Sequence, residues 1–209
     1  VLYDEGMNEK CYPASTTKVL TALCVLENLP LDKIITVPKE AEGVEGSSIY
    51  LKEGQKISVK DLLLGLMLRS GNDAAVTLAV ATSGNIRNFA NLMNETAKRC
   101  GADGSNFVNP HGLHDEMHYT TAYDLALICA KAYENEDFCK IVSTSKAKIT
   151  VDDEARYIGN KNKLLHLYDG ANGVKTGFTK KSGRCLVSGA KRSGMQVVGV
   201  VLNHSDMWN

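Results

Sequence analysis

The stretch STTKVLTALCVL, residues 15–26, places a serine and a lysine at the start of an apolar run long enough for a buried helix. Ser15 stands where such a helix is expected to begin, and the run ends before Pro30, because the residue preceding a proline avoids the helical region. Lys18 follows Ser15 by nearly one helical turn, so the hydroxyl and the amine share a face. The stretch therefore predicts a buried helix with a hydroxyl–amine pair in its first turn.

Helical patterns continue through the middle of the chain, from about residue 60 to residue 133. Four helices are predicted there, over residues 61–68, 73–81, 86–100 and 121–133. The polar stretch Arg69-Ser70-Gly71-Asn72 separates the first two, and Gly101 fits the C-terminal cap of the third. Thr121-Ala122-Tyr123-Asp124 resembles a capping box at the start of the fourth.

The last third of the chain changes to strand patterns. Strands are predicted over residues 146–151, 173–176, 184–191 and 195–203. Arg192-Ser193-Gly194 makes a hairpin turn between the last two, and residues 1–3 are predicted as a further short strand. We therefore expect an α+β fold over residues 1–209, a single domain in which a mostly antiparallel sheet is flanked by helices and an all-helical lobe is inserted at about 60–133.

The composition excludes several classes of protein. Lys+Arg and Asp+Glu both number 24, so the net charge of zero gives no electrostatic footprint for nucleic acid. The longest apolar stretches, such as residues 197–202, are too short to cross a bilayer. None of the six cysteines forms a C-x-x-C pair, so we expect reduced, structural thiols and neither a zinc ribbon nor a redox motif.

Three histidines close in sequence, His111, His114 and His118, suggest a metal site at first sight. However, Asp115 follows His114 where the H-E-x-x-H motif requires glutamate, and Gly112 indicates a loop. We predict that no metal binds there.

Two further short motifs carry possible chemistry. Ser70-Gly71-Asn72 lies in a break between helices, and Lys175-Thr176-Gly177 lies at the end of a predicted strand. Taken singly, each has an ordinary structural explanation: a capping serine with a solvated lysine at Ser15 and Lys18, a polar turn, and a strand that runs into a turn. A desolvated lysine is also a base that activates a serine, so the first motif is compatible with a nucleophile, although by itself it favours the structural explanation.

Together, and in this order, Ser-x-x-Lys, Ser-x-Asn and Lys-Thr-Gly form the signature of penicillin-binding proteins and serine β-lactamases. The chain resembles the D-alanyl-D-alanine carboxypeptidase family of low-molecular-mass penicillin-binding proteins in particular. The stretches that carry this resemblance are residues 13–18, 70–75, 109–113, 121–126 and 173–177. The resemblance implies a β-lactamase/transpeptidase-like fold with the site between two lobes.

The resemblance also implies roles for four catalytic residues. Ser15 is expected to be the acylated nucleophile and Lys18 its general base. Ser70 and Asn72 are expected to assist proton transfer and to hold the peptide.

Four more residues are implied in substrate binding. Lys175 and Thr176 are expected to bind the terminal carboxylate, and Gly177 to let the substrate backbone approach closely. The backbone N–H groups of Phe178 and Ser15 are expected to form the oxyanion hole.

The implied activity is removal of the terminal D-alanine from peptidoglycan stem pentapeptides through an acyl-enzyme, with inhibition by β-lactams and no cofactor. The implied location is the outer face of the bacterial cytoplasmic membrane. Members of the family carry an additional early strand, a later helix and, in many cases, a β-rich domain and a membrane anchor. We therefore expect a sequence trimmed at both ends, with membrane attachment only through segments outside it.

Three other functions remain open. A class A β-lactamase needs a further glutamate, and no Glu-x-x-Leu-Asn lies between Asn72 and Lys175. A non-catalytic peptidoglycan- or penicillin-binding module has no need of the Ser15–Lys18 pair, and a Ser-x-x-Lys esterase or amidase has no need of Lys175. The loop at residues 43–48 either lines the substrate cleft or is a solvated acidic loop.

Overall fold

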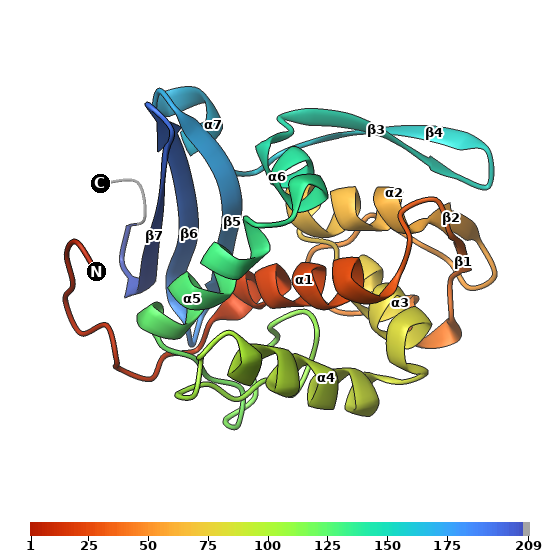
Figure 1. The fold of residues 1–209 in the computed structure, drawn as a ribbon. Coiled ribbons are helices and arrows are strands. Elements are labelled where there is room, and N and C mark those ends of the chain that lie inside the picture. Colours follow the sequence, from red (N-terminus) through yellow and green to blue (C-terminus); the bar gives the residue numbers. More distant parts are fainter. Residues whose placement is uncertain (207–209) are drawn as a thin grey trace.

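The computed structural model describes residues 1–206 and contains two antiparallel sheets with helices between and around them (Figure 1). Helix α1 (Lys18–Asn28) crosses the centre of the molecule. Its apolar residues are buried in a continuous core that the other helices and both sheets share. The helix ends as predicted at Leu29, whose φ of −129° and ψ of 135° are extended.

Six further helices follow along the described chain. They are α2 (Val59–Leu64), α3 (Asn72–Ser83), α4 (Ile86–Arg99), α5 (Ala122–Ala132), α6 (Glu136–Ser143) and the short α7 (Leu164–Leu167). Several begin at a polar N-cap: the Thr121 side chain accepts a hydrogen bond from the Asp124 N–H, and the Asn85 side chain accepts one from the Asn88 N–H. The four predicted helices of the middle region are therefore confirmed, the first with a π-helical turn, η3 (Gly65–Arg69), at its end. Helices α6 and α7 were not predicted from the sequence.

The larger strands form a three-stranded sheet in the order β5–β6–β7 at one side of the molecule (Figure 1). These strands are β5 (Ala171–Thr179), β6 (Gly183–Arg192) and β7 (Met195–His204). Helix α5 packs on β6 and β7, and α6 packs on β5, so one face of the sheet adjoins the core. The three predicted strands and the predicted turn between β6 and β7 are confirmed.

A second sheet lies at the other side of the molecule, in the order β1–β2–β3–β4. Its strands are β1 (Ile34–Thr36), β2 (Lys56–Ser58), β3 (Lys146–Val151) and β4 (Glu154–Gly159). Only β3 was expected from the sequence, because β1 and β2 have three residues each and β4 carries polar residues on a largely exposed hairpin. Antiparallel sheets flanked by helices confirm the α+β class.

The strand predicted over residues 1–3 is wrong. Val1, Leu2 and Tyr3 are 81%, 89% and 82% exposed and belong to no strand. Apolar residues form a strand only where a neighbouring edge supplies hydrogen bonds, and β7, an edge of the larger sheet, pairs only with β6 within the described residues.

Candidate functional site

The first motif begins in a tight 3₁₀ turn, η1 (Ala14–Thr17), that leads directly into α1. Both the N–H and the hydroxyl of Thr16 donate to the Pro13 carbonyl, at 3.2 Å and 2.6 Å, which closes the turn. Ser15 lies within this turn and does not cap α1 with its side chain, so the alternative explanation of a capping serine is wrong. Its half-buried hydroxyl instead lies within hydrogen-bond distance of the Lys18 amine.

The Lys18 side chain is fully buried and its amine has three hydrogen-bond partners on three segments. Nζ lies 2.9 Å from Ser15 Oγ, 2.7 Å from Asn72 Oδ1 and 2.7 Å from the His111 carbonyl oxygen. A solvated lysine beside a capping serine is therefore excluded. A neutral amine has two N–H donors and one lone pair, so this environment matches it well: two carbonyl oxygens accept, and the serine hydroxyl can donate to the lone pair.

Electrostatics also favour the neutral amine at Lys18. Burial lowers its pKa well below the usual range, and the charges of Lys175 and Lys161 lower it further. The Asp73 carboxylate acts in the opposite direction but more weakly. A neutral lysine within hydrogen-bond distance of a serine hydroxyl is the arrangement that general-base activation requires.

The second motif connects the π-helical turn η3 to α3. Ser70 adopts the left-handed conformation, with φ 66° and ψ 30°, and is 5% exposed. Asn72 begins α3 and is hydrogen-bonded on every side: Oδ1 accepts from Lys18, Nδ2 donates to the Glu45 carbonyl at 2.6 Å, and its N–H donates to the Ser47 carbonyl at 2.7 Å. The loop at residues 43–48 therefore contacts Asn72 directly.

The third motif lies on β5, next to the turn that carries Ser15. A Cβ atom built on Gly177 is 3.0 Å from the Ser15 nitrogen and 3.1 Å from both the Pro13 oxygen and the Thr16 nitrogen. These separations are tighter than nine in ten real Cβ contacts and the neighbours are backbone atoms, so glycine favours the close approach of the strand to the turn. From the sequence we expected Gly177 to let the substrate backbone approach closely. In the structure the backbone that approaches Gly177 is that of the protein itself, in the Ser15 turn.

Lys175 is also buried, at 2% exposure, and its Nζ donates to the Thr176 carbonyl at 2.8 Å. Burial lowers its pKa to about 7, with a further contribution from the charge of Lys161. Thr176 is half-buried and pairs with Leu186 on β6. The Phe178 side chain is 58% exposed, with the Arg184 guanidinium 5.4 Å from its ring centre.

The structure thus brings most of the expected residues together. Hydrogen bonds join Ser15, Lys18 and Asn72, Gly177 packs against the Ser15 turn, and the charge of Lys175 acts on Lys18. Within residues 1–206 no hydrogen bond joins the hydroxyls of Ser70 and Thr176 to these groups.

Sequence reasoning missed several groups at the site. The His111 carbonyl could not be found, because a backbone oxygen has no sequence signal. Asp73 follows the second motif directly, and its carboxylate accepts hydrogen bonds from the N–H groups of Ile49 and Leu51. Lys161 donates to the Ser47 hydroxyl at 3.0 Å, although the segment around it has no recognisable motif.

The three histidines hold a loop against the start of α1. His118 Nε2 lies 2.8 Å from Thr17 Oγ1, and its Nδ1 accepts from the Val108 N–H at 3.1 Å. Burial lowers the pKa of His118 to about 4 and that of His111 to about 3, so both rings are neutral at pH 7. His114 packs edge-on against Tyr12. Within the described residues, no three His, Cys, Asp or Glu side chains are grouped to hold a metal ion.

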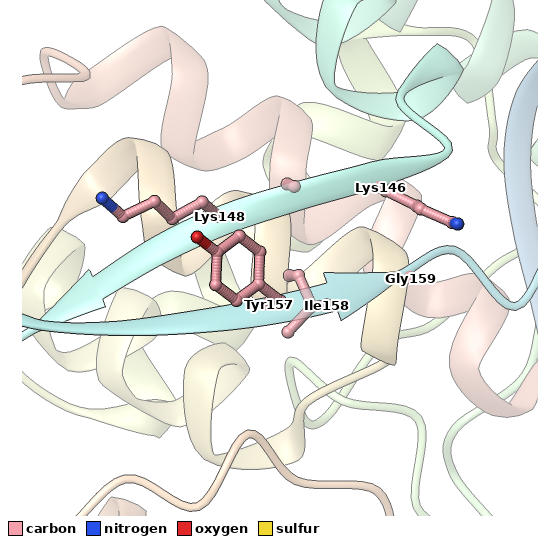
Figure 2. A pocket seen from close by; sticks show the side chains of 6 residues that line it. Lys146, Lys148, Tyr157, Ile158 and Gly159 are labelled. Carbon is pink, nitrogen blue, oxygen red and sulfur yellow. The ribbon is translucent and has the colours of Figure 1, made fainter.

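A surface hollow of about 440 Å³ lies elsewhere, along the β3–β4 hairpin (Figure 2). Lys148 and Tyr157, which face each other across the two strands, line it together with Lys146 and Ile158. It contains none of the residues of the three motifs, so the chemistry described above is not located there.

Comparisons with known proteins agree with the geometry. The family model described as D-alanyl-D-alanine carboxypeptidase matches residues 1–206. The chain is 36% identical to the D-alanyl-D-alanine carboxypeptidase DacF of Bacillus subtilis over 98% of its own length, and 36% identical to DacC of Escherichia coli over 97%. It spans about half the length of these relatives, 54% and 53% respectively.

Solved structures give the same result. The DD-transpeptidase of a Streptomyces strain superposes with a TM-score of 0.89 at 34% identity, covering 96% of this chain and 84% of that one. A penicillin-binding protein homologue from Mycobacterium tuberculosis, Rv2911, superposes with a TM-score of 0.92 at 34% identity, covering 97% and 77%. The expected penicillin-binding/transpeptidase fold is confirmed, and the chain belongs to the D-alanyl-D-alanine carboxypeptidase family.

Proposed function

We propose that this chain is the catalytic domain of a serine-type D-Ala-D-Ala carboxypeptidase. It forms one domain over residues 1–209, with the helical lobe at about 60–133, and removes the terminal D-alanine from peptidoglycan stem peptides. The observation that carries the proposal is the buried Lys18 amine 2.9 Å from Ser15 Oγ. Family membership supplies the substrate class.

The reaction begins at Ser15. Its Oγ attacks the carbonyl carbon between the last two D-alanines while its proton passes to the neutral Lys18 amine. The C–N bond then breaks, and the departing amine of D-alanine takes up a proton from the site. Water attacks the Ser15 ester in the second half of the reaction and releases the shortened peptide. No cofactor has a role in this sequence of steps.

The second motif assists proton transfer and holds the substrate. Asn72 fixes the direction of the Lys18 amine through its Oδ1, and the Ser70 hydroxyl relays the proton to the leaving amine. In this mechanism Asn72 orients the base, Lys18, and Ser70 delivers the proton to the leaving group.

The third motif binds the end of the substrate. Lys175 and the Thr176 hydroxyl hold the terminal carboxylate, whose negative charge favours protonated Lys175. The Gly177 contact sets β5 beside Ser15, so that the N–H groups of Ser15 and Phe178 form the oxyanion hole.

The partners follow from this chemistry. They are stem peptides ending in D-Ala-D-Ala and β-lactams, which acylate the same serine, and nucleic acid has no role. The reaction takes place outside the cytoplasm, at the outer face of the bacterial cytoplasmic membrane. Within the described residues, no helix has the length and apolarity needed to cross a bilayer.

The test is the intact mass of the protein after brief incubation with benzylpenicillin. We expect one covalent adduct per chain, and no adduct on the Ser15→Ala variant, because that variant lacks the nucleophile. Release of D-alanine from a D-Ala-D-Ala peptide, measured on the same two proteins, is expected to fall at least about 10⁴-fold in the variant.

Two outcomes would contradict the proposed function or its mechanism. Rapid loss of penicillin without a lasting adduct would indicate a β-lactamase. D-Alanine release that persists in Ser15→Ala would remove this serine from the mechanism altogether.

A further inference from the structure

Lys161 lies in the segment that follows β4, and its backbone is fixed. Its N–H donates to the Leu68 carbonyl at 3.1 Å, in the π-helical turn that leads to Ser70. The preceding residue, Asn160, donates its N–H to the Ser145 carbonyl at 2.8 Å and its side-chain amide to the Thr144 carbonyl at 3.0 Å. The lysine therefore projects from a held backbone.

The Lys161 side chain holds the loop that covers Asn72. Nζ donates to Ser47 Oγ at 3.0 Å, while the carbonyl of the same serine accepts the Asn72 N–H at 2.7 Å. A Cβ atom built on Gly46 would lie 2.8 Å from Asn72 Nδ2, so the loop backbone is pressed against the amide that orients Lys18. Lys161 thus contacts the loop at Ser47, the residue that also accepts a hydrogen bond from the Asn72 N–H.

A different set of contacts holds the following part of the loop. The Asp73 carboxylate accepts the Ser48 hydroxyl at 2.6 Å and the Leu51 N–H at 2.9 Å. The Arg156 guanidinium donates to the Ile49 carbonyl at 2.9 Å. Asn72 itself donates to the Glu45 and Ser47 carbonyls, so loss of the Lys161 contact would release the Ser47 side chain without detaching the loop.

Lys161 also adds a positive charge to the site. The charged groups that act on Lys18 are Lys175 on β5, Asp73 on α3 and Lys161, and the neutral rings of His111 and His118 also lie within its electrostatic reach. The Asp73 charge is shared among the N–H and hydroxyl donors of the loop. The Lys161 charge lowers the pKa of both Lys18 and Lys175, because a nearby like charge disfavours protonation.

We propose that Lys161 is a positioning residue for acylation, which fastens the Ser47 side chain of the loop at residues 43–47 next to Asn72 and places its ammonium group at that loop. The inference rests on the proposed function, since it assumes that neutral Lys18 activates Ser15. It separates two effects, one mechanical through Ser47 and one electrostatic through the ammonium group.

Two variants distinguish these effects. Lys161→Met removes both the hydrogen bond and the charge, whereas Ser47→Ala removes the hydrogen bond and keeps the charge. The readout is the second-order rate of Ser15 acylation by benzylpenicillin across the pH range. For Lys161→Met we expect about a tenfold lower rate near neutral pH. The acid limb, the part of the pH–rate profile in which the rate rises as Lys18 loses its proton, is expected to move to higher pH. For Ser47→Ala we expect a loss of about threefold at every pH, with the acid limb at the same pH as in the parent protein.

Lys161→Arg is the conservative control, since it retains the charge, and its acid limb is expected to coincide with that of the parent protein. The electrostatic role would be overturned if the pH–rate profile of Lys161→Met matched that of the parent protein. It would also be overturned if the rate fell by the same factor at every pH, with the acid limb in the same place. If Lys161→Met does not fold by circular dichroism, a displaced limb in Lys161→Arg would overturn the proposal in its place. Failure of the proposed function itself is distinguishable, because the parent protein would then form no adduct.

Discussion

The first and third motifs each contain a buried lysine, yet the two side chains have different surroundings. The amine of Lys18 is surrounded by partners from three segments: Ser15, Asn72 and the His111 carbonyl. Within residues 1–206, the amine of Lys175 has a hydrogen bond only to the carbonyl of the next residue, Thr176. Burial lowers the pKa of both.

The difference indicates how one residue type acquires two functions. Lys18 has no spare donor once it is neutral, so it can exchange a proton with Ser15 but cannot bind another group without breaking a contact. Lys175 keeps donor capacity, and an anion that arrives beside it supplies both a hydrogen bond and the charge that it lacks. Under the proposed function, hydrogen-bond partners, rather than burial, distinguish Lys18 as the base from Lys175 as the carboxylate-binding residue.

The largest effect is expected from removal of the base. Lys18→Met keeps an apolar stem of similar length, and the acylation rate with benzylpenicillin is expected to fall at least about 10³-fold, because general-base assistance is worth about 10²–10⁴ and the lost amine also positions Asn72. The measurement is adduct formation over time, with circular dichroism to verify folding. Acylation within about tenfold of the parent would make another group the base.

A smaller effect is expected at Lys175, and mainly in binding. Lys175→Met is expected to raise KM for a D-Ala-D-Ala peptide about 30-fold, with little effect on a peptide whose C-terminus is amidated, because a charge-assisted hydrogen bond contributes about 1.5–3 kcal/mol. Steady-state D-alanine release from the acid and amide forms of one peptide measures this. An equal loss for both forms would exclude carboxylate recognition by this lysine.

The last effect concerns stability and pH rather than catalysis. The pKa of Lys175 is about 7 in the folded chain against 10.5 for the ordinary side chain, so between these values the unfolded chain holds a proton that the folded chain lacks. The free energy of unfolding therefore gains about 1.4 kcal/mol per pH unit from this group as pH rises through that window. Urea denaturation between about pH 7.5 and 9.5 is expected to show a shallower rise in Lys175→Met. Parallel curves for the two proteins would contradict the low pKa.

Much of the site could be predicted because its chemistry is local in sequence. Ser15 and Lys18 are one helical turn apart, and the apolar run after them predicted that they would be buried. The strands β5, β6 and β7 were predicted because each has nine or ten residues and a clear pattern. The orders and spacings of the motifs carried the family resemblance.

The remaining parts depend on contacts between distant segments. The loop over Asn72 is held by Lys161 from more than a hundred residues away, and neither end of that contact has a characteristic local pattern. The strand prediction for residues 1–3 was wrong for the same reason. Strand pairing depends on a neighbouring strand with a free edge, and three apolar residues in a row do not reveal whether one is present. Gly177 was recognised as important, but its close neighbour, the Ser15 turn, appears only in three dimensions.

The left-handed backbone of Ser70 has a consequence for the evolution of heat resistance. A side chain at φ 66° costs about 1–2 kcal/mol relative to glycine, which adopts this region freely. Selection for thermal tolerance alone would therefore favour glycine at this position and eliminate the hydroxyl that the mechanism assigns to proton relay. Serine at this position therefore lowers the stability of the fold but keeps the hydroxyl that the proposed mechanism uses. A more thermostable variant of this protein would have to gain its stability at other positions.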